Sequence, residues 1–276
     1  MAIKDILLPL VGEPTPAAIA AIDKCVALAV DVGARITAVA IEVDVAVAVR
    51  PHVLVSGATE AAESLAKATD LVAAFEAAAV RLGARAVQSI HRVQQRDVAA
   101  YFARAARLAD LTLLPTKPHN ADLESLVERL IFESGRPIVL CPEKLADRLV
   151  STVEHIAIAW DQSAPAARAI ADAMPLLQAA ATVHIFTVTD AETAAERDSG
   201  IALVDHLALH GVAASFEMVK RNGSSIGRVF ATQVEAHAID LLVMGAYHHS
   251  RLNEWVWGGA SNSILNEPPC WVLMSH

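Results

Sequence analysis

The chain has 276 residues, a formal net charge of −9, and a composition that is 54% hydrophobic but only 4% aromatic. This length fits one large domain or two of ordinary size, and the apolar content is sufficient for a substantial core. The acidic balance argues against a general binder of nucleic acid or of anionic membranes, because phosphate-rich surfaces require a basic protein face. It does not exclude a small nucleotide held by a local site.

Apolar runs are interrupted too often to cross a membrane. The mean hydropathy is +0.41, but charges such as Asp23 and Glu42 keep every run below the roughly 20 residues of a span. The first residues also lack the features of a signal peptide. Cys25, Cys141 and Cys270 show no Cys-x-x-Cys spacing. We therefore expect no disulfide framework or cysteine zinc site, and a cytoplasmic location.

The first half of the chain alternates strand-like and helix-like segments. Short apolar runs predict strands, and apolar residues at helical spacing predict the helices between them. The predicted strands are 6–11, 35–43, 84–93, 111–114 and 137–141, and the predicted helices are 16–32, 59–82, 97–108 and 121–133. A polar, charged segment from Pro142 to Thr152 then predicts a linker.

The same alternation restarts after the linker. Predicted strands at 156–160, 182–189, 214–219 and 241–244 alternate with helices at 165–178, 191–210 and 224–237, and a final helix and strand follow. Pro165 suits the first turn of its helix, and Pro175 should kink that helix or end it early.

The two halves correspond residue by residue. The run that begins at Asp110 aligns with the run that begins at Asp240, and the run at Ile6 aligns with that at Ile156. Two strand–helix alternating halves predict an α/β fold with two doubly wound, mainly parallel sheets. The predicted domains are residues 1–145 and 153–276.

Ligands of such sheets bind beyond the carboxyl ends of the strands, at the point where the strand order reverses. In the second half, Asp161 and Gly245 follow the first and fourth strands, whereas Val11 and Pro115 stand at the matching places of the first half. The second half is therefore the better candidate for a binding site.

A glycine-containing segment follows the fourth strand of the second half. The apolar run ends at Gly245, a polar stretch follows, and Gly258-Gly259 precedes the final predicted helix. Glycines allow close approach of a ligand, and the amides at a helix start favour phosphate. The segment therefore predicts a phosphate-binding loop.

A hydrolase is disfavoured, although residues 223–227 match Gly-x-Ser-x-Gly. Ser225 would follow a strand and Asp240 would precede the next parallel strand, which separates them by roughly 15 Å. We interpret Ser224 or Ser225 as a helix cap.

Two histidine pairs suggest metal ligands only weakly. His206 and His210 have helical i, i+4 spacing but no evident third ligand, so a solvated helix face is the preferred interpretation. The His248-His249 pair lies in the proposed loop, and no metal is expected there.

The segment from Asp240 to His248, followed after nine residues by Gly258-Gly259 and by the strand through Cys270, resembles the universal stress protein family. ATP-binding members of that family carry Gly-x2-Gly-x9-Gly-(Ser/Thr) after the fourth strand. The resemblance extends over both halves as two tandem copies. It implies two flavodoxin-like domains, each with a five-stranded sheet.

The resemblance also implies a site and an assembly. It assigns nucleotide binding to the positions that match the family motif or lie beside it: Asp161, Val188, Gly245, His248, Arg251, Gly258, Gly259 and Ser261. The implied ligand is ATP, AMP or ADP, with Mg²⁺ if ATP is bound. The two copies would pair through their last strands as an intramolecular pseudo-dimer, and a homodimer is a further option.

Two positions depart from the family pattern. His248 replaces the second glycine, and Gly259 replaces the Ser/Thr, which removes a phosphate hydrogen bond worth roughly 1 kcal/mol. Two interpretations therefore stay open. The chain is either a stress-response protein that binds a nucleotide in its second copy with at most weak ATPase activity, or a partner-binding scaffold with vestigial sites.

Overall fold

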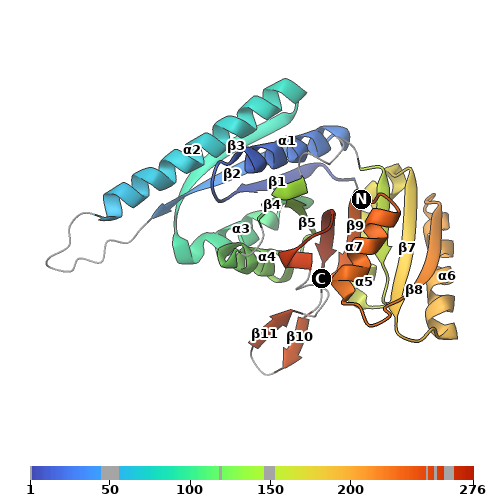
Figure 1. Ribbon diagram of the computed structural model, residues 1–276. Coiled ribbons are helices and arrows are strands. Elements are labelled where there is room, and N and C mark those ends of the chain that lie inside the picture. Colours follow the sequence, from blue (N-terminus) through green and yellow to red (C-terminus); the bar gives the residue numbers. More distant parts are fainter. Residues whose placement is uncertain are drawn as a thin grey trace. The chain divides into compact units, whose positions relative to one another are not determined.

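The computed structural model describes residues 2–44, 56–117, 120–145, 153–246, 248–251, 254–257 and 264–276. The chain divides into two compact units (Figure 1). The N-terminal unit comprises Ile3–Arg136 and Glu143–Ser151. The C-terminal unit comprises Met1–Ala2, Pro137–Pro142 and Thr152–His276.

The N-terminal unit contains a parallel sheet in the order β3-β2-β1-β4. Its strands are β1 (Asp5–Leu10), β2 (Arg35–Asp44), β3 (Arg85–Gln94) and β4 (Leu111–Thr116). Its helices are α1 (Pro16–Asp31), α2 (Ser56–Leu82), α3 (Val98–Ala106) and α4 (Ala121–Glu133), with short 3-10 turns at Gln95–Asp97 and Glu143–Leu145. Helix α1 packs against α2, and α3 packs against α4. Since parallel crossovers are right-handed, the two pairs cover opposite faces of the sheet.

The C-terminal unit contains a sheet in the order β5-β12-β9-β6-β7-β8. Its strands are β5 (Ile138–Pro142), β6 (His155–Ala159), β7 (Thr182–Thr189), β8 (Ala214–Lys220), β9 (Leu241–Gly245) and β12 (Trp271–Ser275). Its helices are α5 (Ala164–Ala179), α6 (Ala194–Leu209) and α7 (Ile226–Ala236). All strand pairs are parallel except β5–β12, which is antiparallel.

The predicted α/β class and the tandem arrangement are confirmed. Each half contributes five strands in the same alternation with helices, and β4, β5, β9 and β12 are buried along their whole length. Continuous burial explains why strands such as Leu241–Gly245 consist of uninterrupted apolar residues. The three cysteines are buried.

Helix α5 continues through Pro175 to Ala179, in agreement with the predicted range 165–178, so Pro175 does not end it early. Two features differ from the sequence-based expectations. A two-stranded hairpin, β10 (His248–Arg251) with β11 (Glu254–Trp257), stands where a polar loop was expected. Finally, β5 belongs by its contacts to the C-terminal unit, although it precedes the predicted linker.

No helix among the described residues is both long enough and apolar enough to span a membrane.

Candidate functional site

The strand order of the C-terminal unit reverses between β6 and β9. Connections from β6 run through β7 to β8 on one side, and β9 is followed by β12 on the other. Ala159 is in register with Met244, so Asp161 and Gly245 both lie at the carboxyl edge of these two neighbouring strands. This is the position at which ligands of doubly wound sheets bind.

The turn from β6 into α5 is held by local hydrogen bonds. Asp161 is exposed, and its Oδ1 accepts a hydrogen bond from the Ser163 amide at 3.1 Å. Ser163 is the N-cap of α5, and its Oγ accepts from the Ala166 amide at 3.1 Å. Asp161 is therefore a fixed carboxylate beside the start of a helix.

Gly245 is required by packing. A Cβ at this position would lie 2.5 Å from Ala166 N and 2.7 Å from the carbonyl carbon of Pro165. The first turn of α5 thus packs against Gly245, at the position where the sequence predicted the close approach of a ligand. Gly245 is a glycine because a helix backbone approaches it closely.

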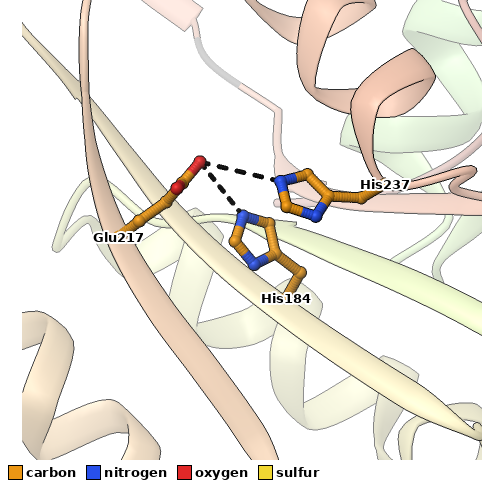
Figure 2. A group of neighbouring side chains, drawn as sticks. All are labelled: His184, Glu217 and His237. Atoms are coloured by element: carbon orange, nitrogen blue, oxygen red, sulfur yellow. Dashed lines mark ion pairs between the residues drawn. The ribbon is translucent and has the colours of Figure 1, made fainter.

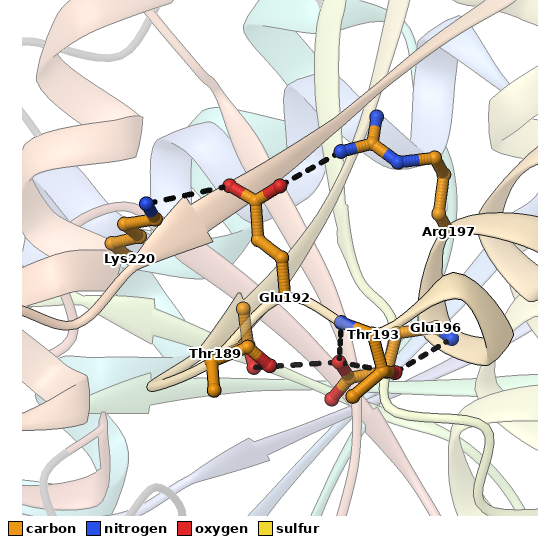
Figure 3. Close-up of polar contacts among 7 residues, drawn as sticks. Thr189, Glu192, Thr193, Glu196, Arg197 and Lys220 are labelled. Atoms are coloured by element: carbon orange, nitrogen blue, oxygen red, sulfur yellow. Dashed lines mark hydrogen bonds and ion pairs between the residues drawn. The ribbon is translucent and has the colours of Figure 1, made fainter.

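The loop after β7 is closed by its own polar contacts (Figure 3). Val188, half-buried near the end of β7, precedes Thr189, whose Oγ1 donates to Ala191 O at 2.9 Å. Thr193 and Glu196 then form a capping box at the start of α6.

Two basic side chains beside this loop are paired with an acidic residue of the loop. Glu192 contacts Arg197 at 2.8 Å and Lys220 at 3.9 Å. Val188 is therefore next to a rigid polar turn whose basic side chains already have an acidic partner.

The remaining predicted site residues lie in or beside the hairpin. His248 and Arg251 are the first and last residues of β10, paired in register with Trp257 and Glu254. Gly258, Gly259 and Ser261 lie outside the described residues. The structure thus places Asp161 and Gly245 together and leaves the predicted phosphate contacts untested.

A cavity of about 760 Å³ lies at the matching carboxyl edge of the N-terminal unit. Its wall includes Val11 and Gly12 after β1, Pro115 and Lys117 at β4, and Asn120 at the start of α4. The N-terminal half lacks a glycine at the position of Gly245, so the sequence did not predict a binding cavity there. The side chains that surround this volume come from helices distant in sequence, so no local motif could indicate it.

The charges around this cavity are mixed. Lys67 pairs with Glu13 at 2.7 Å. Partial burial raises the pKa of Glu143, and the nearby Lys117 opposes that rise.

The hydrolase interpretation fails on geometry. Ser225 is the N-cap of α7, and its Oγ accepts from the Arg228 amide at 3.3 Å. Asp240 lies at the opposite edge, where its Oδ2 accepts from the amides of Glu154 and His155. The prediction that Ser225 caps a helix is confirmed. Asp240 lies at the wrong edge of the sheet to act as the acid of a catalytic triad with Ser225.

A family model and several solved structures match the chain. The sequence model of the universal stress protein family matches residues 152–276. The comparison with curated proteins gave no match.

Solved structures resemble the chain over nearly its full length. A universal stress protein from Archaeoglobus fulgidus is 13% identical, with 98% of this chain and 97% of that chain covered and a TM-score of 0.68. A functionally unknown protein from Pseudomonas aeruginosa is 14% identical over 99% and 92%, with a TM-score of 0.57. The cytoplasmic domain of a prokaryotic cation chloride cotransporter is 11% identical over 98% and 94%, with a TM-score of 0.50.

At these identities the structural matches show the fold, and the match of the family model supplies the relationship. Residues 152–276 match the universal stress protein family, and the two halves of the chain share the α/β fold of the full-length universal stress protein that it matches.

Proposed function

We propose that the protein is a cytoplasmic stress-response protein that binds an adenine nucleotide, ATP or AMP, at the carboxyl edge of the C-terminal unit. The observation that carries this proposal is the place of Asp161 and Gly245. Both lie where the strand order reverses, in the part of the chain that matches the family.

Asp161 is suited to hold the base. Its carboxylate is exposed at the end of β6, and the Ser163 amide fixes its orientation. An adenine amino group can donate to the second carboxylate oxygen, and a charged acceptor makes that hydrogen bond stronger than a neutral one. We assign Asp161 to binding of the base and give it no role in hydrolysis.

The phosphates are assigned to residues after β9. His248 and Arg251 would supply positive charge, and Gly258, Gly259 and Ser261 would supply amides and a hydroxyl. Mg²⁺ would accompany ATP. Because this arrangement includes no dedicated base, we expect binding with at most slow hydrolysis.

A partner-binding scaffold is the second candidate. Two observations favour it: α5 fills the space beside Gly245, and a hairpin replaces the expected loop. A related fold also occurs in the cytoplasmic domain of a cotransporter, and a fold alone does not determine a function.

Calorimetric titration of the full chain with ATP and with AMP tests the proposal. We expect Asp161→Asn, which keeps the shape and the oxygen that accepts from Ser163, to weaken binding about tenfold, the loss expected when a hydrogen bond to a charged group is weakened. Asp190→Asn is the matched control, because Asp190 follows the neighbouring strand and pairs with Arg221 instead.

Absence of heat at millimolar nucleotide would favour the scaffold. If the affinity of Asp161→Asn is unchanged while Lys117→Ala abolishes binding, the nucleotide occupies the cavity of the N-terminal unit and our site is wrong. Gly245→Val is unsuitable as a test, because its side chain would collide with α5 whether or not a ligand binds.

A further inference from the structure

Three side chains that the sequence analysis did not connect meet on one face of the C-terminal sheet. His184 belongs to β7, Glu217 to the neighbouring β8, and His237 directly follows α7 (Figure 2). Their potential ligand atoms all lie within 4.8 Å of one another. Glu217 Oε1 is 3.3 Å from His184 Nε2 and 3.8 Å from His237 Nε2. We call this group the His-Glu-His cluster.

The buried member of the cluster has an unused nitrogen. His184 is only 8% exposed, and its Nε2 has no hydrogen-bond partner among the described residues. Glu217 Oε1 approaches this nitrogen to 3.3 Å, which is close enough for an ion pair.

The other nitrogen of His184 is engaged. Nδ1 lies 3.1 Å from Ser215 Oγ. If Nδ1–H donates to that hydroxyl, the Nε2 lone pair faces the carboxylate of Glu217, and two acceptors then face each other. A cation between them would satisfy both.

A second buried acceptor lies nearby. Gln233 Oε1, one helical turn before His237 on α7, has no hydrogen-bond partner among the described residues. Buried polar atoms without partners are uncommon, and a cation bound at Glu217 together with its water would supply a partner to each of these two.

The histidines are arranged as neutral ligands. The rings of His184 and His237 stack with centroids 3.9 Å apart and planes 23° apart. Two imidazolium cations would repel each other at this distance. Neutral imidazole is the form that binds metals.

We propose that His184, Glu217 and His237 bind a divalent transition-metal ion of the zinc type. Zinc accepts imidazole nitrogen and carboxylate oxygen at about 2.0–2.2 Å in tetrahedral geometry, which places its ligand atoms about 3.3 Å apart. The observed 3.3 and 3.8 Å are close to this spacing. A rotation of the exposed His237 ring would bring both nitrogen lone pairs onto the ion.

The ligand set discriminates between metals. Two imidazoles with one carboxylate favour zinc over magnesium or calcium, which prefer all-oxygen sites. Three protein ligands leave a fourth position for water, and Gln233 Oε1 is available to accept a hydrogen bond from it. Since the side chains of Glu217 and His237 are 41% and 38% exposed, the ion can enter from solvent.

This site is separate from the proposed nucleotide site. His184 lies four residues before Val188 along β7, a distance of roughly 13 Å. The ion would join β7, β8 and the end of α7, so its expected effect is to stabilise the C-terminal unit by binding only the folded state.

The test uses the full chain after treatment with a chelator, with Zn²⁺ titrated by calorimetry and by thermal unfolding. We expect one strong site and a rise in Tm on addition of zinc. His237→Ala and Glu217→Gln alter exposed side chains, so the variants should fold, and each should lose at least about tenfold in zinc affinity, the smallest loss usual for a supporting residue of a metal site. His206→Ala is the matched control, since His206 is an exposed histidine of α6 in the same unit.

Ser215→Ala distinguishes a metal site from a packed histidine. It removes only the group that orients His184, and we expect zinc affinity to fall about tenfold or more. Absence of zinc binding by the wild-type chain would overturn the proposal. Binding that is unchanged in both His237→Ala and Glu217→Gln, or that is lost instead in His206→Ala or His248→Ala, would also overturn it.

Discussion

Asp110 and Asp240 make the same pair of hydrogen bonds at equivalent places in the two halves. Asp110 Oδ2 accepts from the amides of Lys4 and Asp5 at 2.8 and 3.1 Å. Asp240 Oδ2 accepts from the amides of Glu154 and His155 at 3.0 and 2.9 Å. Each carboxylate thus fixes the start of the first strand of its half.

We expect Asp110→Ala and Asp240→Ala each to lower the free energy of unfolding by about 1.5–3 kcal/mol, because each leaves backbone donors without a charged acceptor. Urea denaturation checks this. Asp190→Ala, which removes an exposed ion pair with Arg221, is the control and should cost less than about 1 kcal/mol. Equal losses in all three variants would contradict a special role for the two aspartates.

Gly245→Ala should destabilise the C-terminal unit by about 1–3 kcal/mol, as overpacking commonly does. The added Cβ would lie 2.5 Å from a backbone nitrogen of α5, which cannot rotate away. Thermal unfolding without any nucleotide measures the effect. Gly211→Ala is unsuitable as a control, because Gly211 has a φ of +79° and any side chain there would be strained.

Gly200 lies inside α6. In a helix interior, alanine is normally more favourable than glycine by about 1 kcal/mol. Here we expect Gly200→Ala to be destabilising, because its Cβ would lie 2.1 Å from the ring of Phe216. A double-mutant cycle with Phe216→Ala tests the cause. In that background Gly200→Ala should become neutral or stabilising, and an unchanged loss would show that the ring is not responsible.

Glu143 should make stability depend on pH. Burial raises the pKa of its carboxyl group in the folded state above the ordinary 4.5, so ionisation at neutral pH opposes folding. Glu143→Gln should therefore raise the Tm at pH 7. The advantage should shrink as pH falls through the raised pKa and vanish below 4.5. Glu235→Gln, at an exposed position of α7, is the control for the substitution itself.

The fold could be predicted from sequence because its signals are local. Buried parallel strands such as Leu241–Gly245 are uninterrupted apolar runs, and Ser163 and Ser225 occupy cap positions directly before helices. The hairpin was not predicted, because the glycines of the family pattern favoured a loop. The run Trp255-Val256-Trp257 has a high strand propensity and was the signal for the second strand.

The site could be predicted only in part. The order of strands places Asp161 beside Gly245, and the rule that ligands bind beyond the carboxyl ends of parallel strands had selected both residues. A glycine that admits a ligand and a glycine that admits a helix are identical in sequence, so the reason for Gly245 required coordinates. The His-Glu-His cluster depends on the register of β7 against β8 and on where α7 ends, and neither is encoded by local spacing.

The antiparallel pairing of β5 with β12 affects how the protein is made. On the ribosome, β5 emerges with the first half of the chain, but the strand it pairs with emerges after all the others described here. Until then the apolar edge of β5 lacks this partner and is open to pairing with other chains. The C-terminal unit therefore becomes complete only when synthesis has passed β12, and the two halves are interdependent during folding.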